Sequence, residues 1–211
     1  MSVRILNAAE MSEHAALLKC RRCPALRHQF SKLRRTYPDF WNLPVVPSGP
    51  STAPLLIVGL APGLHGANRT GVPFEGDASG NLLQSALERL NLVGQVRITN
   101  VLKCLPRQNK PTTAELNRCH GYIEQELTDF TGQGGRGIFA VGRVAHARVL
   151  KALGFKQSAF TFAHGAVHAL PGPLWLIDTY HCSRYNTQTG RITPAMFEQA
   201  LSRAARLAVA T

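Results

Sequence analysis

The sequence lacks the features that place a chain in or across a membrane. None of its apolar runs approaches the roughly 20 residues that a membrane-spanning helix needs. The segment Met1–Glu10 contains one arginine and no apolar core, so we expect no secretory signal and a cytoplasmic location. Internal repeats and low-complexity stretches are absent too. A length of 211 residues predicts one domain over residues 1–211, which we expect to be monomeric.

Acidic residues are scarce as well. The chain has 12 Asp and Glu residues against 24 Lys and Arg residues, which gives a formal net charge of +12 at pH 7. Such an excess favours a polyanionic partner, namely DNA, RNA or an anionic membrane surface, although many basic proteins bind none of these. Of these partners we favour a nucleic acid.

Cysteine is limited to five residues, and four of them suggest a metal site. Cys20 and Cys23 form a C-x-x-C pair, and Cys104 and Cys119 add two more thiols. Four thiolates can hold either zinc or a 4Fe–4S cluster, and the spacing alone does not separate the two. Burial without any metal is the simpler alternative, because free cysteine is often internal. Cys182 is far in sequence from the other four, and we predict that it is not a ligand.

Short apolar runs alternate with amphipathic stretches along the chain. Continuous apolar runs are typical of strands buried on both faces, and stripes at a spacing of three and four residues are typical of helices. The predicted strands cover residues 55–59, 96–102, 137–141 and 174–179. Helices are predicted over residues 8–18 and 143–153. Three more are predicted from their caps: one begins at Ser79, one opens with a Thr112–Glu115 capping box and runs to about Leu127, and the last is capped by Thr193. This alternation predicts a parallel sheet with helices on both faces.

Ligands of parallel sheets bind beyond the carboxyl ends of the strands. The loops at that edge are 60–78, 103–111 and 180–192, and they hold the least generic sequence of the chain. Loop 60–78 is rich in glycine, which lets the backbone approach a ligand closely. It has neither the G-K-S/T ending of a Walker loop nor a G-x-G-x-x-G pattern, so neither of those nucleotide sites is predicted.

Three motifs in these loops resemble the family 5 (type B) uracil-DNA glycosylases. They are GLAPGLHGANRTGVPFEGDASG at 59–80, ITNVLKCLPRQNKP at 98–111 and HCSRYNTQTGRITP at 181–194, and the resemblance covers roughly residues 16–205. It implies a three-layer α/β/α sandwich with a central four-stranded parallel sheet. It implies a monofunctional glycosylase that flips uracil, often with other deaminated bases, out of DNA and leaves an abasic site. It also implies that Cys20, Cys23, Cys104 and Cys119 hold a structural 4Fe–4S cluster.

Breaking an N-glycosidic bond builds positive charge on the sugar and negative charge on the departing base. His181 follows the fourth predicted strand, and it is our first candidate for donating a hydrogen bond to that developing anion. Asn100 ends the second strand, and its amide offers one donor and one acceptor to the edge of uracil. Phe74 offers a face on which the flipped base stacks. Three loop residues complete the expected substrate contacts: Ala61, Pro62 and Gly63.

The sequence leaves open which residue handles the attacking water. Other branches of the superfamily carry Asp, Glu or Asn at the position of Ala61, and alanine cannot activate water; family 5 shares this departure. Asn68 and Asp77 are the candidates, with equal weight. An amide can orient water but is a poor base, whereas a carboxylate at this position can also serve as a helix cap. His65 and Glu75 are less favoured alternatives.

The loop that follows His181 is predicted to contact DNA. Its candidates are Ser183, Arg184 and Tyr185, and one of the last two side chains is expected to fill the gap left by the flipped nucleotide. Three basic residues near the third cysteine are further candidates for phosphate contacts: Lys103, Arg107 and Lys110.

A non-catalytic DNA-binding protein clasped by a metal is the competing interpretation. This interpretation also explains the net positive charge and the four cysteines, and it takes Ala61 as a sign that catalytic activity has been lost. A relative that captures uracil covalently is not favoured, because such a protein needs a nucleophilic histidine in an insertion that this sequence lacks.

Overall fold

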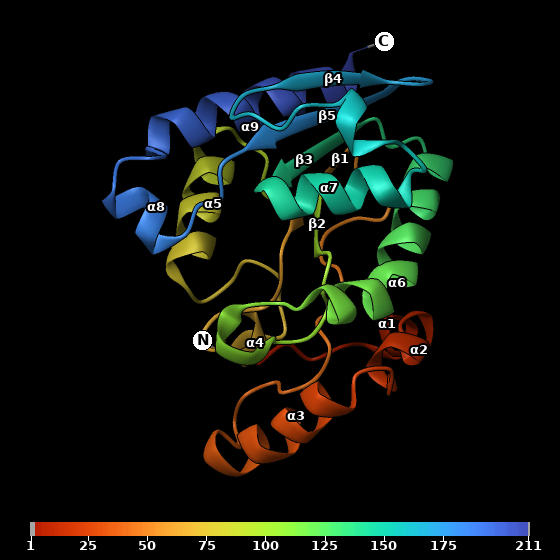
Figure 1. The fold of residues 1–211 in the computed structure, drawn as a ribbon, viewed down its shortest axis with the longest axis vertical. Helices are drawn as coiled ribbons and strands as arrows, with labels where there is room; N and C mark the ends of the chain where they lie inside the picture. The colour runs from red at the N-terminus through yellow and green to blue at the C-terminus, as the bar shows by residue number, and fades with distance from the viewer. Residues whose placement is uncertain (1–2, 211) are drawn as a thin grey trace.

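The computed structural model describes residues 3–210, and within them five strands form one sheet (Figure 1). The strands are β1 (Leu55–Gly59), β2 (Val96–Asn100), β3 (Gly137–Val141), β4 (Val167–Leu170) and β5 (Leu174–Thr179), in the order β2–β1–β3–β5–β4. β2, β1, β3 and β5 are parallel, as predicted. The expectation of four strands is corrected by β4, a four-residue edge strand that pairs antiparallel with β5.

Helices cover both faces of the sheet, which confirms the three-layer architecture (Figure 1). One face carries α5 (Ala78–Arg89) and α9 (Pro194–Val209), and the other carries α6 (Thr113–Gly132) and α7 (Arg143–Ala152). Leu55 of β1 packs with α5 and α9, whereas the next residue, Leu56, packs with α6 and α7. The run 55–59 is apolar throughout because both faces of the strand are buried.

Three helices that precede the sheet lie at one end of the molecule (Figure 1). They are α1 (Ala8–Glu13), α2 (Ala15–Leu18) and α3 (Pro24–Thr36). The prediction of one helix over 8–18 is wrong, because the backbone at His14 (φ −103°, ψ 14°) separates two short helices. α3 was not predicted, and its buried residues are only Leu26 and Phe30.

Short helical segments also occur inside the predicted loops. They are α4 (Ala67–Thr70), α8 (Arg184–Gln188) and the 3-10 helices η1 (Arg107–Asn109) and η2 (Gln157–Ala159). Within the described residues, no helix has the length and apolar character that crossing a membrane requires.

The helix caps are set largely by the predicted side chains. Thr112 and Glu115 form the expected capping box of α6, and Thr193 caps α9 by accepting from the backbone N–H of Met196. The predicted cap of α5 is wrong by two residues. Asp77, not Ser79, holds that position, and its Oδ1 accepts from the backbone N–H of Gly80 at 2.9 Å.

Candidate active site

Three loops converge on a cavity of about 240 Å³ at the carboxyl ends of β1, β2 and β5. This is the edge at which parallel sheets bind their ligands. The sequence had marked eight of the lining residues: Ala61, Pro62, Gly63, Phe74, Asp77, Asn100, His181 and Ser183. His181 and Asn100, which are 81 positions apart in the chain, therefore face one space.

Asn100 and Phe74 meet across Gly59 at the end of β1. A Cβ atom at Gly59 would overlap both the Oδ1 atom of Asn100 and the ring of Phe74, so glycine is required there. Phe74 has a φ of +55°, a left-handed backbone value that is uncommon for an aromatic residue. The Asn100 amide is buried and makes no hydrogen bond to any other described side chain or backbone group. A free amide beside an aromatic ring suits the edge and face of a planar base.

His181 lies in the loop after β5 and packs against Gly142, which directly follows β3. The Nδ2 atom of Asn186 donates to the His181 carbonyl at 2.8 Å, and the backbone of Gly142, with a φ of +101°, lies behind the side chain. Burial lowers the pKa of His181, and the negative charge of Asp77 offsets part of that shift. The imidazole is therefore neutral at pH 7, and one ring nitrogen can donate a hydrogen bond into the cavity.

Asp77 lines the cavity, and its two carboxylate oxygens have different neighbours. Oδ1 caps α5, whereas Oδ2 lies against the backbone of the glycine-rich loop. A Cβ at Gly63 would come within 2.9 Å of Oδ2, and one at Gly66 would overlap it. The glycines of this loop thus leave room for a carboxylate beside the cavity, with an electrostatic influence on His181.

Asn68 is placed differently from Asp77. Its side chain is buried, and its Nδ2 donates to Asn42 Oδ1 at 2.9 Å. Its Oδ1 has no hydrogen-bond partner among residues 3–210. It is not among the residues that line the cavity. Arg184 and Tyr185 are exposed outside the cavity, while Ser183 lines it and caps α8.

Sequence reasoning missed several residues of the cavity: Leu60, Ala67, Ser79, Pro106 and Asn109. Asn109 offered one signal in the sequence, its place in a predicted edge loop. Its left-handed φ of +56°, which asparagine tolerates, appears only in the structure. Ser79 closes one side by donating its Oγ–H to the Cys182 carbonyl at 3.1 Å. The lining is therefore built by all three motif segments.

Lys103 does not fit the phosphate-contact role suggested for it. Its side chain is fully buried, forms an ion pair with Glu126 at 2.6 Å and donates to Thr99 Oγ1 at 2.7 Å. A buried and paired ammonium cannot reach a DNA phosphate. Arg107 and Lys110 are exposed.

A second cavity, of about 260 Å³, is lined by four cysteines. Cys20 and Cys23 come from the turn between α2 and α3, Cys104 from the loop after β2, and Cys119 from α6. All four cysteines belong to the described part of the chain, and none forms a disulfide there. No three of their sulfur atoms lie within 4.8 Å of one another. Burial and the neighbouring thiols raise the pKa of Cys104, and burial raises that of Cys119 to about 11. Thiols that are hard to ionise in this cavity can lose their protons when they bind a metal centre.

Cys182 is separate from that group. It is buried beside the first turn of α5, with its sulfur 3.7 Å from the Ser79 carbonyl. Burial raises the pKa of this thiol to about 12, which makes it a poor nucleophile at neutral pH.

Comparison with known proteins gives one consistent result. The model of the Uracil DNA glycosylase superfamily matches residues 46–205. A Type-5 uracil-DNA glycosylase of Thermus thermophilus is 40% identical over 91% of this chain and 95% of its own length. A protein with the same description from Mycobacterium leprae is 38% identical over 92% of this chain and 94% of its own length. Another from Pyrobaculum aerophilum is 37% identical over 90% of this chain and 89% of its own length.

Proposed function

The chain belongs to the uracil DNA glycosylase superfamily, in its type-5 branch, and we propose on that basis that it removes uracil from DNA by hydrolysing the N-glycosidic bond. The single observation that carries the proposal is the shared cavity of Asn100, Phe74, His181 and Asp77. A base inside a duplex cannot reach such a cavity, so the nucleotide must be extruded from the stack.

The cavity offers separate groups for base and sugar. The free Asn100 amide reads the edge of uracil, and the Phe74 ring packs on its face. Neutral His181 donates a hydrogen bond to the base as negative charge develops on it. The strongest assistance to bond cleavage comes from such donors, because they are in place before the charge appears.

Asp77 is the group that we assign to the sugar and the water. Asp77 lines the cavity, whereas Asn68 is buried against Asn42 and does not line the cavity. A negative charge stabilises the cationic sugar, and a carboxylate oxygen can orient the water that attacks it. The structure therefore favours Asp77 between two candidates that the sequence had weighed equally.

An excision assay tests the function directly. The purified protein should convert uracil-containing oligonucleotides to abasic sites without added metal or nucleotide, and hypoxanthine and xanthine substrates define its range. Tight DNA binding with no cleavage of any of these bases would instead support the non-catalytic alternative.

We propose a 4Fe–4S cluster in the cysteine cavity. A zinc ion with Zn–S bonds of about 2.3 Å would draw four sulfurs to roughly 3.8 Å from one another, closer than this cavity holds them. Arginine side chains, among them Arg22 and Arg118, surround the thiols and suit an anionic cluster. When bound, the cluster would tie the N-terminal helices to α6 and the loop after β2, as a structural link.

Replacing Cys104 by alanine should remove the cluster and much of the stability of the fold, because cluster binding and folding are linked. We expect iron and sulfide to fall from about four per chain, with loss of the broad absorbance near roughly 400 nm. Cys182→Ala is the matched control, since that thiol is buried outside the cavity. Zinc in the purified protein, or full iron content in the Cys104 variant, would contradict the assignment.

A further inference from the structure

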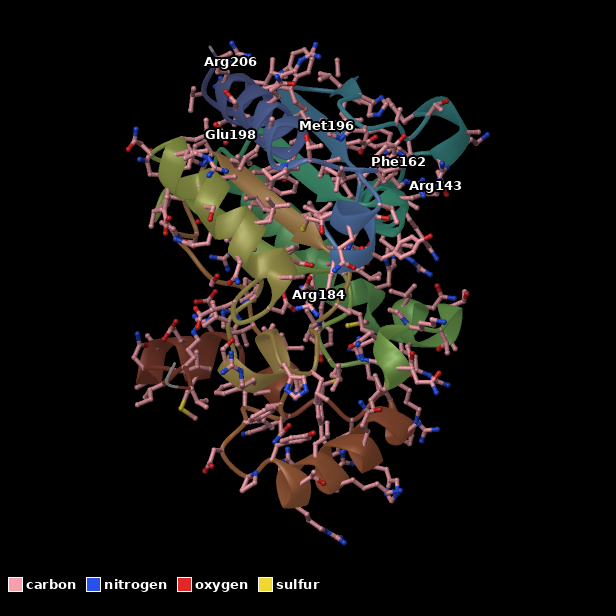
Figure 2. All side chains as sticks on the ribbon, turned by 90° about the vertical axis from the view of Figure 1, so that its left-hand side faces the viewer. Arg143, Phe162, Arg184, Met196, Glu198 and Arg206 are labelled. Atoms are coloured by element: carbon pink, nitrogen blue, oxygen red, sulfur yellow. The ribbon has the colours of Figure 1, made fainter. Side chains whose placement is uncertain are left out.

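Two arginines near His181 are each held over an aromatic ring. Arg143, the first residue of α7, lies with its guanidinium carbon 5.1 Å from the centre of the Phe162 ring, and Figure 2 shows the two side by side. Arg191, between α8 and α9, lies in the same way 4.9 Å from the centre of the Tyr180 ring. A guanidinium over a ring face is held in place by a cation–π interaction.

Each pair contains a residue that lies next in the chain to a residue at the edge of the sheet where the base cavity opens. Arg143 directly follows Gly142, whose backbone lies behind His181. Tyr180 directly precedes His181 at the end of β5. The two guanidinium groups therefore flank the loop that carries the proposed base-contacting histidine.

Neither guanidinium forms an ion pair with a carboxylate of the described residues. Within residues 3–210, the side chains of Arg143 and Arg191 form no ion pair and no hydrogen bond, and both residues are exposed. Arg89, by contrast, pairs with Glu198 at 2.6 Å on the face of α9. The ring contacts leave the N–H groups of both arginines available, and these can bind a phosphate in a bidentate manner.

A buried network holds the ring under Arg143. Phe162 packs edge-on against the His146 ring, 5.5 Å between centres. His146 Nδ1 lies 2.8 Å from Asp178 Oδ1, and its Nε2 lies 3.0 Å from the Phe160 carbonyl oxygen. His168 Nε2 contacts the second carboxylate oxygen of Asp178 at 3.0 Å, so the carboxylate is fully used within the core. These lengths are those of hydrogen bonds, and the network gives the ring a rigid support.

Tyr180 is supported in a similar way. The His164 ring packs against it at 5.3 Å, and His164 Nδ1 lies 3.3 Å from Thr179 Oγ1. Burial lowers the pKa of His164, so this imidazole adds no charge near Arg191 at pH 7. At pH 7 the charged groups of these two ring contacts are therefore the arginines.

We propose that Arg143 and Arg191 form a strip that binds phosphates of the DNA strand from which the base is extruded. The inference rests on the proposed function. Phosphate, and not a base, is the expected ligand because guanidinium groups already cover the ring faces on which a base would stack. The strand is the uracil-bearing one because the strip flanks the loop of His181, next to the cavity that receives the uracil.

Salt-dependent binding tests the strip. The probe is a duplex containing 2′-fluoro-2′-deoxyuridine, whose fluorine disfavours positive charge on the sugar and so prevents cleavage. Arg143→Ala and Arg191→Ala should each lower the slope of log affinity against log salt by about 0.9, and the double variant by about 1.8, if each arginine neutralises one phosphate. Arg143→Lys should keep the slope and still bind more weakly, because lysine lacks the planar fork.

Arg206→Ala is the matched control. This arginine is exposed near the end of α9, where Ala208 packs against Gly137 at the start of β3, and it lies far from Arg143 in Figure 2. Its removal should leave the slope unchanged. Neutral methylphosphonates beside the uracil should abolish the difference between wild type and the strip variants, whereas the same change in the opposite strand should not.

Equal slopes for the strip variants, the control and the wild type would overturn the inference. Dependence on phosphates of the opposite strand would also overturn it. The same preparations are assayed for excision of normal uracil: a wild type that cleaves while the slopes stay equal refutes the strip alone, whereas a wild type that never cleaves refutes the proposed function.

Discussion

Asp77→Asn is expected to lower the rate constant of uracil excision by about 10²- to 10⁴-fold, the range of a lost general base or its equivalent. The substitution removes the negative charge beside the cavity but keeps the shape of the side chain. Asparagine caps helices as well as aspartate does, so the bond from Gly80 N–H and the melting temperature should change little. Single-turnover excision and thermal unfolding measured on the same preparation separate these two roles.

Asn68→Ala is the natural comparison, because it alters the other candidate of the same loop. It removes the hydrogen bond to Asn42 within the core, and we expect a loss of about 1–3 kcal/mol of unfolding free energy. Excision per folded molecule should remain near that of the wild type, since Asn68 does not line the cavity. The opposite pattern, with Asn68→Ala inactive and Asp77→Asn active, would show that the water is handled by the amide.

The core of the fold was predictable because its pattern is local. The strand 55–59 is buried on both faces, so its continuous apolar run reveals it without knowledge of its neighbours. β4 has no such run: it contains a half-buried His168 and an exposed Ala169 at the edge of the sheet. α3 escaped prediction for a related reason, since most of its surface faces solvent and only two of its side chains are buried.

The sequence predicted which site residues stand at the ends of the strands, but not the directions of the side chains in the loops that follow. His181 and Asn100 follow β5 and close β2, and strand ends of a parallel sheet meet at one edge. Asp77 and Asn68 share a single loop, and the direction of each side chain depends on the helical turn α4 and on left-handed Gly71 and Gly76. Such geometry is set by contacts across the fold, which sequence spacing does not contain.

Lys103 illustrates the same limit for charge. In the sequence it is one of several basic residues beside a cysteine, and a basic chain makes phosphate binding the natural expectation. Its partner Glu126 lies on α6, 23 positions further along the chain. That pairing appears only when α6 packs on the sheet, and it converts a candidate DNA contact into a buried ion pair.

His181→Ala should lower the excision rate by about 10²- to 10³-fold, as expected for the loss of one preorganised donor to a developing anion. The wild-type histidine acts in its neutral form, because burial lowers its pKa below the ordinary 6.5. Activity should therefore not decline as pH rises through 6.5. His181→Gln, which retains a donor, should recover part of the lost rate.

The same pKa shift fixes the sign of a stability effect. Near pH 6 the unfolded chain binds a proton at His181 that the folded chain binds only at lower pH, so this residue makes stability fall as pH decreases below about 6.5. His181→Ala should weaken that acid sensitivity, measured as the change in melting temperature between pH 8 and pH 5. Asp77→Asn should push the His181 titration still lower, because the carboxylate charge raises the pKa of the imidazole. An NMR titration with a midpoint above 6.5 would mean that the imidazolium, and not the neutral ring, assists the departing base.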